Sequence, residues 1–324
     1  MAYEETGLTE KPVIALIGTG MIASSMAALS AGHGLHTFVF ARSLASENRC
    51  RNYVRSAYLD MEEQGLMTDA QREICETYVH YVYTYEELQS ADIAFECIVE
   101  NADEKHAIYR KLEENCPKLK AVCSVSSSIV PEVLAEGMEK YGDRIFVTHP
   151  FNPAHMVPYF ELCTAENTAP EAVEYAVKVL ELLDRRPVLL KKTTPGFIGN
   201  RLQFALLREA LKLVEEGIAD PEDIDTCLKY SFCPRYTSIG IFEHFDNGGL
   251  ELCSTVAGNL FPILSDEKEV PKLITDLMAE GKTGAKAGEG FYDWRNTDME
   301  AYRKRVSAPY WKFCRWELPE EADE

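Results

Sequence analysis

Apolar and polar positions alternate in blocks up to about residue 190, and the blocks predict short strands separated by helices. Stretches with helical periodicity occur at residues 44–80, 101–114 and 169–183. Short apolar runs suited to buried strands occur at residues 12–17, 36–40, 91–100, 121–123, 144–148, 159–162 and 186–190. Alternation of strand and helix is typical of a parallel sheet covered by helices. We therefore predict an α/β domain with a doubly wound parallel sheet.

The pattern changes at residues 191–196, a polar segment that contains proline and glycine and has the composition of a domain boundary. Helical periodicity follows it, from residue 197 to 216, and a second helix is expected from the Asp220-Pro221 cap to about Tyr230. We therefore expect residues 1–192 to form one domain and residues 193–324 to form an all-helical second domain.

Two of the predicted strands, residues 144–148 and 159–162, flank a turn signal at Asn152-Pro153. If these strands lie side by side, Glu161 returns to His149. A carboxylate at one ring nitrogen fixes the tautomer and stabilises the imidazolium, so the other nitrogen can take a proton from a substrate hydroxyl. The pattern predicts a general-base pair; the alternative is a structural histidine at a strand end.

The first predicted strand runs directly into a glycine-rich turn and a helix of small residues. Gly18 allows a tight turn, Gly20 lets the backbone approach a pyrophosphate, and Ala23 lets helix and strand pack closely. Free N–H groups at the helix start, at Met21 and Ile22, favour an anion. The context indicates a Rossmann-type dinucleotide site, with a plain strand–helix turn as the alternative.

The second predicted strand ends at Arg42-Ser43, where NAD enzymes of this fold usually place an acidic side chain for the ribose hydroxyls. An arginine and a hydroxyl at this point suit a 2′-phosphate instead. The expected cofactor is therefore NAD or NADP, with NADP favoured by Arg42.

Composition narrows the class of protein further. With 324 residues and 46% hydrophobic content, the chain is long enough for two cores. It has no run of eighteen apolar residues and no basic, apolar signal pattern at its start, so we expect a cytoplasmic protein that does not bind membranes. The net charge of −20 repels phosphate backbones, so nucleic-acid binding is not expected. The ten cysteines show no C-x-x-C spacing, so neither a metal site nor disulfides are expected.

The run HPFNPAHMVPYFE, residues 149–161, resembles the catalytic signature of the 3-hydroxyacyl-CoA dehydrogenase family. This resemblance implies that His149 is the catalytic base, Glu161 its orienting partner and Asn152 a substrate contact. Residues 195–225 and the KAGEGFYDW run at residues 286–294 also resemble the family. The similarity covers roughly residues 12–295.

The resemblance also implies roles for residues outside 149–161. Ser127 aligns with a catalytic-site serine and Asn200 with a substrate contact, while Glu100, Lys105 and Lys286 align with positions beside the cofactor. The chain departs from the family at three places, where the family's aspartate falls at Arg42, its usual asparagine at Val125, and a frequent glycine at Cys233-Pro234. These departures bear on the choice of cofactor and substrate.

The resemblance implies a homodimer that moves a hydride between NAD(P) and the 3-hydroxy group of a short-chain 3-hydroxyacyl-CoA, in fatty acid metabolism. Pro158 and the Arg235-Tyr236 segment also resemble the lambda-crystallin, gulonate and carnitine dehydrogenase branch, which acts on free hydroxy acids. Arg235 would then bind the substrate carboxylate, or else form a salt bridge. A third alternative is a crystallin-like binding protein without turnover.

Overall fold

The computed structural model describes residues 6–320. The chain divides into two compact units: Met1–Phe197 together with Arg303–Glu324 form the first, and Ile198–Tyr302 form the second. The expected second domain extended to residue 324, whereas here the C-terminal segment belongs to the first unit.

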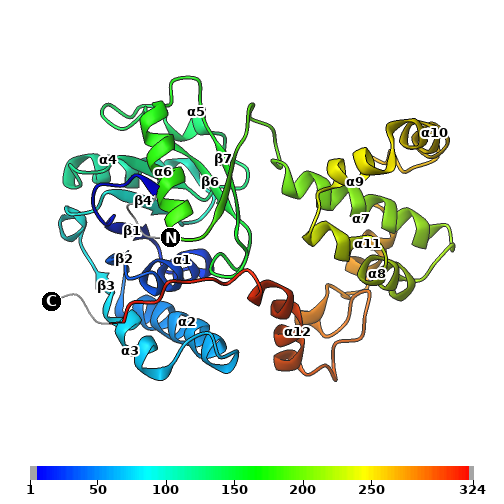
Figure 1. The fold of residues 1–324 in the computed structure, drawn as a ribbon, viewed down its shortest axis with the longest axis horizontal. Coiled ribbons are helices and arrows are strands. Elements are labelled where there is room, and N and C mark those ends of the chain that lie inside the picture. Colours follow the sequence, from blue (N-terminus) through cyan, green and yellow to red (C-terminus); the bar gives the residue numbers. More distant parts are fainter. Residues whose placement is uncertain (1–5, 321–324) are drawn as a thin grey trace. The chain divides into compact units, whose positions relative to one another are not determined.

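The first unit is built on an eight-stranded sheet with strand order β3-β2-β1-β4-β5-β6-β7-β8 (Figure 1). Neighbouring strands are parallel except β6 and β7, which are antiparallel. The strands are β1 Ile14–Ile17, β2 Thr37–Phe40, β3 Val79–Val82, β4 Ile93–Glu96, β5 Ala121–Ser124, β6 Ile145–Pro150, β7 Tyr159–Cys163 and β8 Arg186–Leu189. The order reverses between β1 and β4, and ligands of such sheets bind beyond the carboxyl ends of strands at this point.

Helices cover both faces of the sheet (Figure 1). Alternate residues of β1 enter two different apolar clusters, since side chains alternate along a strand: Ile14 and Leu16 pack with residues of α1, α2 and α6, and Ala15 and Ile17 with residues of α4 and α5. The helices are α1 Met21–Gly32, α2 Leu44–Glu63, α3 Asp69–Thr77, α4 Ala102–Asn115, α5 Pro131–Leu134 and α6 Pro170–Leu182. The predicted doubly wound α/β fold is confirmed.

One element differs from the sequence prediction. The helical stretch expected at residues 44–80 is interrupted after α3, and Val79–Val82 pair with β2 as a parallel edge strand. This strand is four residues long, with only its two end residues buried, so it lacks the apolar run by which the other strands were found.

The second unit is helical, as expected. It contains α7 Gly199–Glu215, α8 Pro221–Tyr230, α9 Ile241–Gly248, α10 Leu250–Leu260 and α11 Lys272–Ala279, with two 3₁₀ turns at Cys233–Thr237 and Ala285–Ala287. Helix α12, Met299–Trp311, spans the division between the units. Within residues 6–320, no helix is both long and apolar enough to cross a membrane.

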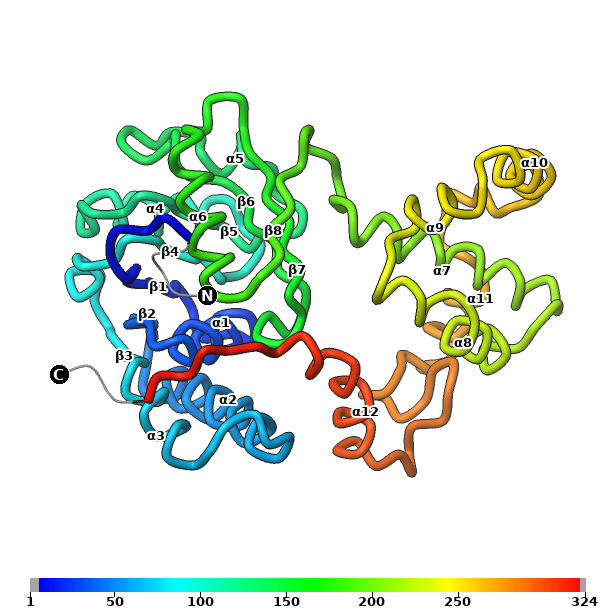
Figure 2. Tube along the Cα trace, viewed as in Figure 1, coloured from blue at the N-terminus to red at the C-terminus, as the bar shows by residue number. Residues whose placement is uncertain are grey.

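The C-terminal segment after α12 runs along α1, as the red end of the trace in Figure 2 shows. Trp316 lies on Gly32, where an added Cβ would come within 2.5 Å of the indole ring, and its ring is 5.4 Å from that of His33. Glycine at position 32 therefore makes room for the indole, which covers the end of the helix.

Candidate active site

The turn between β1 and α1 requires glycine at its first position. Gly18 has φ +123°, a conformation that L side chains rarely adopt, and a Cβ there would lie 2.8 Å from the carbonyl oxygen of Cys97. The residue after β4 thus touches the turn after β1, which keeps the backbone at the carboxyl ends of these two strands close together.

The start of α1 fits a pyrophosphate. Gly20 is the N-cap residue, no side chain caps the helix, and a Cβ on Gly20 would meet nothing within 4 Å. The first bond of the helix runs from the Ser24 N–H to the Gly20 carbonyl (2.9 Å), so the N–H groups of residues 21–23 precede it. Open space in front of uncapped N–H groups suits the phosphates of a dinucleotide.

At the end of β2, the guanidinium of Arg42 is exposed. Ser43 caps α2, its hydroxyl accepting the N–H of Ser46 at 3.3 Å. The nearest acid along the chain, Glu47, accepts a hydrogen bond from Arg51 at 2.7 Å and another from the hydroxyl of Tyr83. Arg42, and not an acidic residue, is therefore the exposed charged side chain directly after β2.

The predicted pairing of His149 with Glu161 is confirmed by the sheet, because the two residues are register partners in the antiparallel pair β6–β7. The distance from Nδ1 to Oε2 is 3.4 Å, and the hydroxyl of Tyr159 donates to Oε1 at 3.2 Å. Glu161 is fully buried, and the His149 side chain is 12% exposed. A proton on the nitrogen that faces the carboxylate leaves Nε2 as the acceptor.

Burial lowers the pKa of His149 below its usual 6.5, while the hydrogen bond and charge of Glu161, and the charge of Glu100, act in the opposite direction. The imidazole is therefore neutral near pH 7, the form that a general base needs. The rings of Phe151 and Phe197 lie 5.8 and 5.3 Å from the imidazole and form the apolar surroundings.

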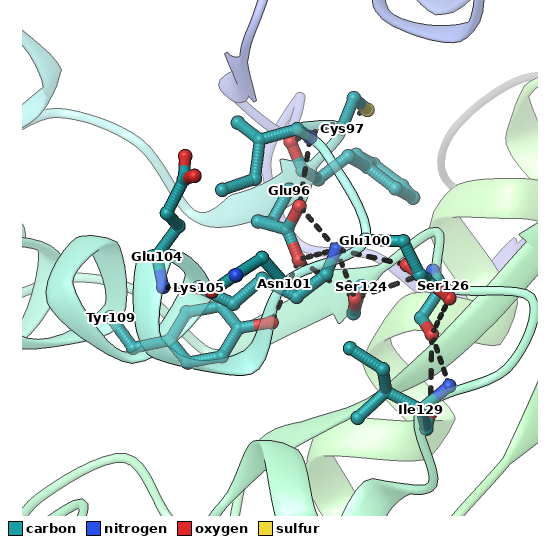
Figure 3. A network of polar contacts seen from close by, with 12 residues as sticks. Glu96, Cys97, Glu100, Asn101, Glu104, Lys105, Tyr109, Ser124, Ser126 and Ile129 are labelled. Atoms are coloured by element: carbon teal, nitrogen blue, oxygen red, sulfur yellow. Dashed lines mark hydrogen bonds and ion pairs between the residues drawn. The ribbon is translucent and has the colours of Figure 1, made fainter.

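Glu100 holds the serine turn that follows β5 (Figure 3). Its Oε1 accepts the Ser126 hydroxyl at 2.7 Å, the backbone N–H groups of Ser127 and Ser128 at 3.0 and 2.9 Å, and the Ser128 hydroxyl at 2.8 Å. Burial opposes ionisation, but these hydrogen bonds and Lys105 outweigh it and lower the pKa of Glu100 to about 2. Ser127 is exposed at the tip of this turn.

Beneath this turn lies a buried ion pair that the sequence reasoning missed (Figure 3). Glu96, the last residue of β4, accepts Lys105 Nζ at 2.8 and 2.7 Å, Tyr109 at 2.8 Å and Ser124 at 2.7 Å. Lys105 is fully buried, and its Nζ is 3.6 Å from Glu100. The available signal was an acid at the end of an apolar strand, nine residues before a lysine. The direct cofactor contact expected of Lys105 stays a prediction.

The loop that joins β6 to β7 contains the exposed Asn152 and is anchored at His155. His155 Nδ1 lies 2.7 Å from Ser25 Oγ of α1, and the His155 N–H donates to the same oxygen at 2.9 Å. The buried guanidinium of Arg185 donates to the carbonyls of Ala154 and His155 at 3.2 and 3.4 Å. Both anchors were missed, because no local pattern relates residues so far apart in the sequence.

Three expected site residues belong to the second unit, so their roles stay predictions. Asn200 lies in the first turn of α7, Lys286 is exposed in the 3₁₀ turn Ala285–Ala287, and Arg235 donates from Nη1 to Nε2 of His244 at 3.2 Å. Among residues 6–320, no group of three or more His, Cys, Asp or Glu side chains is arranged to hold a metal ion.

Comparison with known families gives two adjacent matches. The model for the NAD-binding domain of 3-hydroxyacyl-CoA dehydrogenase matches residues 13–193, and that for the C-terminal domain of the same enzyme matches residues 196–294.

Individual relatives cover most of the chain. A 5-formyl-3-hydroxy-2-methylpyridine 4-carboxylate 5-dehydrogenase of Mesorhizobium japonicum is 30% identical over 86% of this chain and 89% of its own length. An L-carnitine dehydrogenase of Pseudomonas aeruginosa is 33% identical over 75% of this chain and 74% of its own.

Solved structures agree with these relatives. The crystal structure of a 5-formyl-3-hydroxy-2-methylpyridine 4-carboxylic acid 5-dehydrogenase, described as an NAD⁺-dependent dismutase, has a TM-score of 0.82 at 29% identity and covers 95% of this chain and 100% of that one. The (S)-3-hydroxybutyryl-CoA dehydrogenase of Ralstonia eutropha has a TM-score of 0.71 at 26% identity, covering 88% and 99%.

Proposed function

The chain belongs to the 3-hydroxyacyl-CoA dehydrogenase family and is thus an NAD(P)-dependent oxidoreductase, and we propose that it oxidises the hydroxyl group of a small free hydroxy acid with His149 as general base. The observation that carries the proposal is the strand register, which sets the imidazole of His149 against the buried carboxylate of Glu161.

In the proposed reaction, His149 Nε2 takes the hydroxyl proton while the C–H bond of the alcohol carbon breaks and a carbonyl forms. NAD(P), when bound, would supply the nicotinamide ring that takes up the hydride lost from that carbon. Glu161, beside the other ring nitrogen, stabilises the imidazolium that results. In the reverse direction, the imidazolium returns its proton to the carbonyl oxygen. Ser127 follows β5 and Asn152 follows β6, and both are exposed; we propose that they bind the reacting oxygen.

The residues of the first unit suit the cofactor, and the second unit is proposed to help bind substrate. The N–H groups after Gly20 would hold the pyrophosphate. Arg42 would form charge-assisted hydrogen bonds to a 2′-phosphate, each worth roughly 1.5–3 kcal/mol. We propose that NADP(H) is used at least as well as NAD(H).

The free acid is favoured by the named relatives. Carnitine and a pyridine 4-carboxylate both carry a free carboxylate, and the two dehydrogenases described above, which are named for them, are 30% and 33% identical to this chain. Arg235 is the proposed carboxylate ligand, since a guanidinium binds a carboxylate through two hydrogen bonds. The second candidate is a short-chain 3-hydroxyacyl-CoA, as in the structure from Ralstonia eutropha.

The substrate test follows NAD(P)H absorbance with a panel of small hydroxy acids that includes L-carnitine, and with 3-hydroxybutyryl-CoA. We expect turnover of a free acid and a fall in kcat/KM of roughly 10²-fold in Arg235→Leu, because the guanidinium would no longer pair with the substrate carboxylate. Turnover of 3-hydroxybutyryl-CoA alone, unaffected by Arg235→Leu, selects the second candidate. No turnover of any substrate, with NADH still bound, favours the crystallin-like alternative.

The cofactor test compares kcat/KM for NADP and NAD in the wild type and in Arg42→Asp. A carboxylate at this position accepts ribose hydroxyl groups and repels a 2′-phosphate, so the substitution should shift the preference toward NAD by about 10²-fold, which corresponds to about 2.8 kcal/mol. A wild type that strongly prefers NAD, and a preference that does not change in the variant, would show that Arg42 does not contact the ribose.

We further propose a homodimer. Apolar side chains of the second unit are unusually exposed: Leu202 62%, Phe204 63%, Phe242 89% and Phe261 72%. A second copy of the chain is the occupant that we propose for them, since exposure of many large apolar groups marks an interface. Sedimentation should give twice the mass of 36.5 kDa, and Phe204→Glu with Phe242→Glu should reduce it to that of one chain. A wild type that sediments as a single chain would contradict the dimer.

A further inference from the structure

Ser25 and His155 form a neutral, fully enclosed contact between α1 and the β6–β7 loop. Burial, and then the charge of Arg185, lower the pKa of His155 to about 3, so the imidazole is uncharged at neutral pH. The Ser25 oxygen accepts the backbone N–H of His155 at 2.9 Å, and its hydroxyl can donate to Nδ1 of His155, 2.7 Å away. One hydroxyl thus satisfies a buried backbone donor and a buried ring nitrogen at once.

The contact joins the helix proposed to bind the cofactor to the loop proposed to bind the substrate. Ser25 lies in the second turn of α1, directly after the N–H groups that fit the cofactor phosphates. His155 lies three residues after Asn152, in the loop between the strands that carry His149 and Glu161. The strands themselves fix His149 opposite Glu161, so the contact is needed for the loop and not for the pair.

We infer that Ser25 and His155 are positioning residues that hold the Asn152 loop to the cofactor helix, so that a nucleotide bound at α1 also orders the loop that meets the substrate. This inference deepens the proposed function and rests on it for the role of Asn152. An anion bound at the start of α1 reduces the motion of this helix. Because the Ser25 hydroxyl is hydrogen-bonded to the His155 backbone, the motion of the loop is reduced as well. By reciprocity, an ordered loop tightens nucleotide binding.

Hydrogen exchange tests the inference without a substrate. Amide exchange of residues 151–159 is measured with and without saturating NADH in the wild type, Ser25→Ala and Ser30→Ala. The control is matched, because Ser30 is buried in the same helix and its hydroxyl has no hydrogen-bond partner among the described residues. NADH should slow exchange in the wild type and in Ser30→Ala by about fivefold, the worth of one hydrogen bond, and the slowing should disappear in Ser25→Ala.

A variant of the histidine separates the hydrogen bond from packing. An asparagine at position 155 can place an oxygen near the site of Nδ1, so His155→Asn should retain part of the effect of NADH and His155→Leu should lose it. Thermal unfolding and NADH titration of each variant confirm that it folds and binds nucleotide. Absence of slowing in the wild type, or equal slowing in Ser25→Ala, would overturn the inference.

Steady-state kinetics with the acid turned over provides a second readout. Ser25→Ala should raise KM for that acid by about fivefold, with a smaller change in kcat, and should leave the pH midpoint of the rate unchanged because the His149–Glu161 register remains. A changed pH midpoint would contradict the division of roles. If no acid is turned over, the proposed substrate class fails, while the exchange experiment still decides whether the two residues act as described.

Discussion

At the scale of residues, the protonation state of His149 is set by opposing influences. Burial lowers the pKa, whereas the carboxylates of Glu161 and Glu100 raise it, and the net result is a pKa below 6.5. A neutral imidazole is therefore present at physiological pH, as the proposed role of general base requires, and the buried carboxylate beside it would stabilise an imidazolium.

The pH dependence of oxidation tests this balance. In the wild type, kcat/KM should rise with pH through the His149 pKa, below 6.5, and then level off, because only the neutral base accepts a proton. Glu161→Gln removes a group that raises this pKa, so the midpoint should move to lower pH, and the plateau should fall by roughly 10²-fold. Tyr159→Phe keeps the carboxylate and should leave the midpoint nearly unchanged. A midpoint that moves upward in Glu161→Gln would contradict the assignment.

Sequence reasoning placed His149 and Glu161 together because twelve residues with a central turn signal define a hairpin. It did not find Ser25–His155 or the anchoring of the loop by Arg185. These contacts join different elements, 130 residues apart in the first case, and depend on how helices pack on the sheet. Nothing in local periodicity encodes that packing.

At the scale of elements, Gly18 and Gly20 in the turn between β1 and α1 have different roles. Gly18 is required by the fold, since its φ of +123° and its approach to Cys97 exclude a side chain. Gly20 is not required by the fold, because a Cβ there has open space. The open space at Gly20 leaves room for a ligand in front of the N–H groups at the start of α1.

Two substitutions separate these roles. Gly20→Ala should change the free energy of unfolding by less than about 1 kcal/mol, as for other N-cap exchanges, while reducing NADH affinity by at least about tenfold. Gly18→Ala should destabilise the fold by roughly 1–3 kcal/mol through backbone strain. Urea unfolding and NADH fluorescence titration provide the two measurements. Full NADH affinity in a well-folded Gly20→Ala would remove the pyrophosphate from this turn.

Most elements of the sheet could be predicted because their apolar runs are continuous, as in β1 and β4. The edge strand β3 could not, since the sequence Val79-His80-Tyr81-Val82 mixes polar and apolar positions and directly follows a helix. Its strand conformation comes from hydrogen bonds to β2, a non-local cause.

At the scale of the whole molecule, the chain leaves the first unit at residue 198 and returns to it at residue 303. The expectation of two domains in sequence order did not include this return. The returning segment packs Trp311, Trp316 and Leu318 on the core of the first unit, and Trp316 contacts Gly32 and His33. Local periodicity does not reveal contacts between segments so far apart in the sequence.

The returning segment should contribute to the stability of the full chain. Trp316→Ala should reduce the free energy of unfolding by about 3 kcal/mol, a typical cost for loss of a large packed aromatic side chain. Arg315→Ala, at the exposed neighbouring position, should change it by less than about 0.5 kcal/mol. Equal stability of the two variants in urea unfolding would show that the segment is not part of the first unit's fold.

We propose that His149 is the proton acceptor of this nicotinamide-dependent dehydrogenase. The most direct test measures kcat and the NADH dissociation constant of His149→Gln side by side with the wild type. We expect a fall in kcat of about 10²- to 10⁴-fold with unchanged NADH affinity, and no further loss when Glu161→Gln is added. Turnover by His149→Gln close to that of the wild type would contradict it.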